Sequence, residues 1–171
     1  MRPDRWRKRG RAPTVARMIR RTALLLTALV ALLAAAPVAQ ADDESTYRAW
    51  TVENKTLRTH EERLDKNLDS WAKGGSNGPA RERISKIRSL IGRRDKAVRA
   101  EETSSSKGAK GRSNALAMLR DYEAAMLKLR SAVTGKRSQA NARIKEYNAL
   151  IKRSRTYEDR ALTYFEAAGV A

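Results

Sequence analysis

Apolar residues recur at intervals of three and four along the chain from residue 47 to residue 165, the spacing typical of one buried face of an α-helix. Segments rich in Gly, Ser or Pro divide this pattern into four stripes, which predicts four helices. The alternation with a period of two that indicates a half-buried strand is missing from the sequence. We therefore expect an all-α fold, an antiparallel helical bundle of about four helices forming a single domain over residues 42–171.

The first stripe runs from Tyr47 to Trp71 and predicts one long helix, which ends at the segment GGSNGP over residues 74–79. Thr59 and Glu62 have the spacing of a capping box, so a break near Thr59 is the alternative. Pro79 suits the first turn of the second helix, because an N–H group there has no partner within the helix. The second stripe consists of Ile84, Ile87, Leu90, Ile91 and Val98.

The segment TSSSKGAKG, residues 103–111, separates the second stripe from the third, and its Ser, Gly and Lys content predicts a flexible connector. The third stripe runs from Leu116 to Val133, and the following Thr134-Gly135 is a helix C-cap signal. The fourth covers residues 144–165 and is wide, which suits a helix that packs against more than one neighbour.

An apolar run over residues 22–41 follows three arginines and ends in Ala39-Gln40-Ala41. A basic, then apolar, then small-residue order is typical of a secretory signal peptide, here with cleavage after Ala41. An uncleaved single-pass anchor, with residues 42–171 outside the cytoplasm, is the alternative. Residues 1–17 are an Arg-rich stretch before Met18, and they form either a misassigned start or an unstructured extension. We expect an exported protein, secreted or associated with the cell envelope.

The full chain has 171 residues, with 37 Lys and Arg against 19 Asp and Glu and a net charge of +18. The basic excess beyond the leader is concentrated in residues 74–112, which contain 11 basic and 4 acidic residues, whereas residues 42–73 contain 6 basic and 8 acidic residues. The absence of cysteine excludes a disulfide scaffold, a thiol nucleophile and a cysteine-ligated zinc site.

His60 is the single histidine, and the carboxylates of Glu61, Glu62 and Asp65 lie close to it in the sequence. A histidine beside carboxylates is a candidate general base or metal ligand, but a metal site in a helical bundle needs further strong ligands from facing helices. The acids are interleaved with Lys and Arg, which is typical of ion pairs on a solvated helix face. We therefore expect no enzymatic activity, no metal or other cofactor and no small-molecule substrate.

The basic side chains of the second predicted helix lie off its apolar stripe, and those of the connector extend the same surface. Such a surface attracts anionic polymers or acidic lipids, with nucleic acid a less favoured partner outside the cytoplasm. The alternatives are a solvated face that pairs with the acidic first helix, and a structural protein that pairs its helices with another copy or another exported protein. The candidate anion-binding residues are Arg81, Lys86, Arg88, Arg93, Lys96, Arg99, Lys107, Lys110 and Arg112, which Arg153 and Arg155 could join.

Overall fold

The structure is a computed structural model that describes residues 42–171, and nearly all of these residues are helical. A helical segment over residues 42–51 precedes four longer helices: α2 (Asn54–Ala72), α3 (Gly78–Ala100), α4 (Ser106–Thr134) and α5 (Arg137–Ala167). The described residues contain no strand, so the expected all-α helical bundle is confirmed. The expected signal peptide lies outside the described residues.

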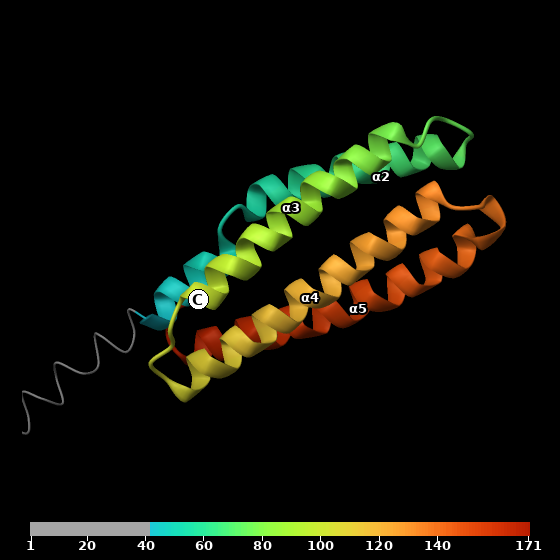
Figure 1. Cartoon of the computed structure of the whole chain (residues 1–171). Helices are drawn as coiled ribbons and strands as arrows, with labels where there is room; N and C mark the ends of the chain where they lie inside the picture. Colours follow the sequence, from blue (N-terminus) through green and yellow to red (C-terminus); the bar gives the residue numbers. More distant parts are fainter. Residues whose placement is uncertain (1–41) are drawn as a thin grey trace, which may run out of the picture. The chain divides into compact units, whose positions relative to one another are not determined.

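The four helices form two antiparallel hairpins (Figure 1). α2 and α3 lie side by side as one hairpin, and α4 and α5 form the other. The two hairpin loops lie at the same end, and α3 packs against α4 to join the hairpins. Each helix thus contacts the next one along the chain, which is the up-down order that short links favour.

The core consists of the inward-facing residues of all four stripes. The second stripe, from Ile84 to Val98, is fully buried, as the spacing predicts. At one end, Tyr47 and Trp50 pack on Phe165 of α5 with ring centroids 5.5 and 5.8 Å apart. These contacts hold residues 42–51 against the α4–α5 hairpin, so this first described helical segment contributes to the core.

The apolar stripe predicts one uninterrupted first helix, and this prediction is wrong at residues 52–53. The helix breaks there, because Glu53 adopts a left-handed conformation with φ of 64°. The alternative break near Thr59 is not seen either, since the Thr59 hydroxyl donates to the Lys55 carbonyl at 3.0 Å inside α2. The stripe continues across the break, which is why periodicity alone does not reveal it.

The flexible connector predicted over residues 103–111 is shorter than expected, because α4 already begins at Ser106. Asp43 explains the early start: its buried carboxylate accepts hydrogen bonds from the Ser104 and Ser105 amides at 3.2 and 3.4 Å, and from the Ser105 hydroxyl. The Ser105 hydroxyl in turn accepts from the Gly108 amide at 2.8 Å and caps the helix. A partner distant in sequence thus orders a segment whose composition indicates a loop.

Candidate functional site

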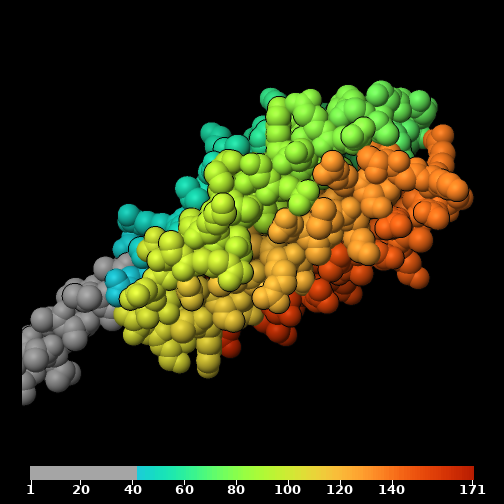
Figure 2. Space-filling view, in the orientation of Figure 1, coloured from blue at the N-terminus to red at the C-terminus, as the bar shows by residue number. Residues whose placement is uncertain are grey.

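The basic residues predicted to bind an anion share the outer face of α3, opposite its buried stripe. Five of the six on this helix are exposed and Arg88 is half-buried. Figure 2 shows the side chains of α3 (green to yellow-green) lying open beside those of α4 on the same face of the described bundle. The six residues are Arg81, Lys86, Arg88, Arg93, Lys96 and Arg99. We call them the α3 basic face.

Four members of the α3 basic face form ion pairs. Lys86 contacts Glu82 at 2.6 Å and Arg99 contacts Asp95 at 2.7 Å, both one helical turn away. Arg93 contacts Glu53 at 2.9 Å, and Arg88 contacts Glu123 of α4 at 3.2 Å. Ion pairs between exposed side chains contribute little free energy, because water and salt screen them.

These pairs leave the face positive. A hydrogen bond to Asp95 raises the pKa of Arg99, and a hydrogen bond from Lys86 lowers the pKa of Glu82, so both contacts favour the charged forms of Arg99 and Glu82. Arg81 and Lys96 form no ion pair within 4 Å with any residue that the structure describes. The α3 helix as a whole carries eight basic and two acidic residues.

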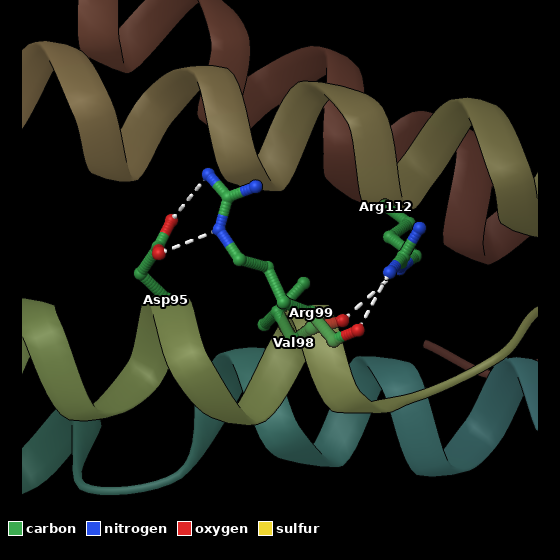
Figure 3. Close-up of polar contacts among 4 residues, drawn as sticks. All are labelled: Asp95, Val98, Arg99 and Arg112. Carbon is green, nitrogen blue, oxygen red and sulfur yellow. Dashed lines mark hydrogen bonds and ion pairs between the residues drawn. The ribbon is translucent and has the colours of Figure 1, made fainter.

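Arg112 occupies a different position from the one expected of a ligand-binding residue. Its guanidinium extends from α4 to the last turn of α3, where Nε donates to the Val98 carbonyl at 3.0 Å and Nη2 to the Arg99 carbonyl at 2.9 Å (Figure 3). Carbonyls in the last turn of a helix lack partners within the helix, so Arg112 satisfies them from outside. Figure 3 also shows the Asp95–Arg99 pair one turn earlier on the same helix.

Lys107 and Lys110, the other predicted residues, contact α5 and not the α3 basic face. Lys107 Nζ donates to the Ala167 carbonyl at 3.0 Å, and the Lys110 ammonium lies 5.7 Å from the centre of the Tyr164 ring. Arg153 forms a two-bond ion pair with Asp121 of α4, and Arg155 lines a cavity on the inner side of the bundle. Sequence reasoning therefore groups more residues than the structure brings together.

His60, the catalytic candidate that the sequence offers, contacts a cation. Arg83 Nη1 donates to His60 Nδ1 at 2.6 Å, because a guanidinium has no lone pair to accept with. Burial, then the charges of Arg83, Lys86 and Arg63, lower the pKa of His60 below its ordinary value of 6.5. These surroundings favour the neutral imidazole of His60. Within residues 42–171, no group of three or more His, Cys, Asp and Glu side chains is placed to hold a metal ion.

The structure contains a cavity that sequence reasoning missed. Its volume is about 730 Å³, and residues from all four helices line it. Arg94 of α3 contributes a side chain that is 2% exposed, and Glu61 of α2 accepts a hydrogen bond from the Tyr122 hydroxyl. Burial, then Glu158 and Asp65, raise the pKa of Glu61. The full lining is Asn54, Lys55, Leu57, Arg58, Glu61, Leu64, Asp65, Arg94, Met118, Tyr122, Met126, Tyr147, Ile151, Ser154, Arg155 and Glu158.

One sequence signal does point to this cavity. Arg94 lies three residues after Ile91 and four before Val98, so it occupies a position of the apolar stripe. A charged residue at such a position is rarely buried without a partner. Its place in the stripe therefore marks it as a candidate for a role inside the bundle.

None of the helices described in residues 42–171 is sufficiently long and apolar to cross a membrane. Comparisons of the chain with protein-family models, with curated proteins and with solved structures return no match.

Proposed function

We propose that the protein is an exported, non-enzymatic helical protein that binds an anionic component of the cell envelope through the α3 basic face. The observation that carries the proposal is that this face is exposed along the length of one helix. Arg81 and Lys96 there have no carboxylate partner within the described chain. A row of cations on a rigid helix matches the regularly spaced charges of an anionic polymer or an acidic lipid surface.

Helix pairing with a second copy receives less support. The exposed large apolar side chains of the described residues are Val52, in the turn before α2, and Leu127, in α4. They belong to different elements and form no stripe of the kind that helix pairing buries. Sedimentation equilibrium of the purified protein is expected to show a monomer at tens of micromolar.

The test is co-sedimentation of the protein with isolated cell envelopes at low ionic strength. The test variant carries Glu at four positions of the α3 basic face: Arg81, Lys86, Arg93 and Lys96. The matched control carries Glu in place of four exposed cations of the α4–α5 hairpin, at Lys136, Lys145, Lys152 and Arg160, which gives the same net charge.

The α3 variant should lose envelope binding, whereas the control variant should keep most of it. Circular dichroism establishes that both variants remain helical. Equal binding by the α3 variant and the wild type contradicts the proposal. Equal loss in both variants indicates an effect of net charge alone, and it also contradicts a site on α3.

A further inference from the structure

The interior of the bundle holds a cation that no carboxylate of the described residues contacts at ion-pair distance. Arg94 lies on the inner face of α3 and is 2% exposed, yet none of the ion pairs of the described residues includes it. Its Nε atom is buried with no hydrogen-bond acceptor. Removing a guanidinium from water is costly unless an anion contacts it. Arg94 has no such contact, so it is a candidate binding site for an anion that enters the cavity.

Part of the role of Arg94 is structural. Its Nη2 donates to the Trp50 carbonyl, which lies just before the helix break at residues 52–53. Arg112 and Lys107 satisfy carbonyls in a similar way, but from half-buried or exposed positions. One carbonyl occupies one nitrogen of the guanidinium and brings no negative charge, so it explains the position of Arg94 but does not pair its charge. The carboxylates of Glu158, Glu53 and Glu61 act on Arg94 from beyond ion-pair distance.

The other charges around the cavity balance one another. Three acids, Glu61, Asp65 and Glu158, line the cavity together with three cations, Lys55, Arg58 and Arg155, and all of these except the half-buried Glu61 are exposed. Arg94 adds one positive charge at the buried side, so the lining as a whole is complementary to a single negative charge.

Part of the cavity lining is apolar. Leu57, Leu64, Met118 and Met126 are all less than 9% exposed and line the cavity, and Tyr147 and Ile151 add half-buried surface. At about 730 Å³ the space lies within the range that small organic ligands occupy. The lining thus combines one buried cation with a group of apolar side chains, beside the charged and polar residues that make up the rest of it.

We propose that this cavity binds a small amphipathic carboxylate, with the carboxylate at Arg94 and a short aliphatic body against the apolar side chains of the lining. The ligand anion would accept from Arg94 and complete the charge balance of the cavity. The site is independent of the proposed envelope binding, because it uses the inner face of α3 and the envelope contact uses the outer face.

The test is isothermal titration of the full-length protein with octanoate, together with octanamide and octylammonium as neutral and cationic probes of the same length. Octanoate is expected to bind saturably at one site. Octanamide should bind at least about tenfold more weakly, because it lacks the charge that pairs with Arg94. Octylammonium should show no saturable binding. Absence of saturable octanoate binding, or equal binding of octanoate and octanamide, overturns the proposal.

Two variants locate the site. Arg94→Met removes the charge and puts an unbranched apolar side chain in its place. The protein should therefore stay helical and lose at least about tenfold in octanoate affinity. Glu158→Gln removes the carboxylate whose charge acts most strongly on Arg94, so octanoate should bind about threefold or more tightly. Asp159→Asn is the matched control one residue further along α5, outside this cavity, and should leave the affinity unchanged.

Unchanged octanoate affinity in a folded Arg94→Met variant shows that Arg94 only caps the Trp50 carbonyl, and the proposal then fails. If Arg94→Met does not fold, Glu158→Gln decides, and an affinity equal to that of Asp159→Asn overturns the proposal. Envelope binding by the α3 basic face is measured separately, so failure of either proposal leaves the other to be judged on its own result.

Discussion

Two glycines in the first turns of α4 let neighbouring side chains approach more closely than a Cβ atom permits. A Cβ on Gly108 would collide with the Asp43 carboxylate, and one on Gly111 would lie 3.0 Å from the Phe165 ring. Both glycines come from the segment whose composition predicts a loop. Their small size, and not their backbone freedom, is what the fold uses there.

Gly108→Ala should therefore destabilise the protein by about 1–3 kcal/mol, because Asp43 would have to leave its place at the start of α4. Gly92→Ala in α3 is the matched control, since a Cβ there meets nothing within 4 Å. That variant should gain about 0.5–1 kcal/mol from the better helix propensity of alanine. Urea unfolding measures both, and equal effects of the two substitutions would contradict the packing argument.

Glu61 makes the stability of the protein depend on pH in the opposite direction from a carboxylate in an ion pair. Burial, then Glu158 and Asp65, raise its pKa above the ordinary value of 4.5, so the folded state holds the Glu61 proton more tightly than the unfolded chain. The resulting stabilisation is fully present below pH 4.5 and is lost as the pH rises through the folded-state pKa.

Glu61→Gln should remove this dependence, because the amide stays neutral and still accepts from the Tyr122 hydroxyl. Urea unfolding of both proteins should show the wild type losing stability relative to the variant as the pH rises from about 4 to about 7. The exposed neighbour substitution Glu62→Gln is the control. A difference between wild type and Glu61→Gln that stays constant with pH would argue against a buried Glu61.

Among the helices, side chains from neighbouring elements satisfy the C-terminal carbonyls. Arg137 donates to Ala72 of α2 at 3.2 Å, and Asn77 donates to Val133 of α4 at 3.1 Å. Arg112 and Lys107 do the same for α3 and α5. Part of the basic excess of the chain therefore serves to join helices.

Arg112→Met tests this role. The variant keeps the aliphatic stem but loses both hydrogen bonds to α3, so the free energy of unfolding should fall by about 1–2 kcal/mol. Arg81→Met, at an exposed position without an ion pair, should change stability by less than about 0.5 kcal/mol. Thermal or urea unfolding that shows the same stability for both variants would contradict the capping role of Arg112.

The four helices follow directly from the period of the apolar residues, and Pro79 and Gly135 stand where the sequence signals place the helix ends. Two features do not follow from period or composition. The break at Glu53 leaves the stripe in phase, and the early start of α4 depends on Asp43, about sixty residues earlier. Local patterns carry no information about a partner so distant in the chain.

For the molecule as a whole, helical periodicity places six of the nine predicted anion-binding residues on one helix face. The remaining three depend on how the hairpins meet, and there Lys107, Lys110 and Arg112 contact α5 or the end of α3. The same holds for the cavity residue Arg94. Its position in the apolar stripe is visible in the sequence, but the cavity that it lines forms only when all four helices are assembled.

The structure gives α3 two separate faces with different charge environments. The outer face carries solvated cations in weak pairs, and the inner face carries Arg94 in the bundle interior. Salt screens the first far more than the second, because only the outer charges are surrounded by water. Ionic strength therefore distinguishes binding on the outer face from binding in the cavity.

The most direct measurement is co-sedimentation of the purified protein with isolated cell envelopes across a salt series, from about 20 mM to about 500 mM NaCl. Binding should be strong at low salt and should be released progressively as salt rises, since the contact is electrostatic. The variant with four Glu residues on the α3 basic face should stay in the supernatant throughout. Binding that is absent at low salt, or that salt does not release, would contradict an electrostatic contact through α3.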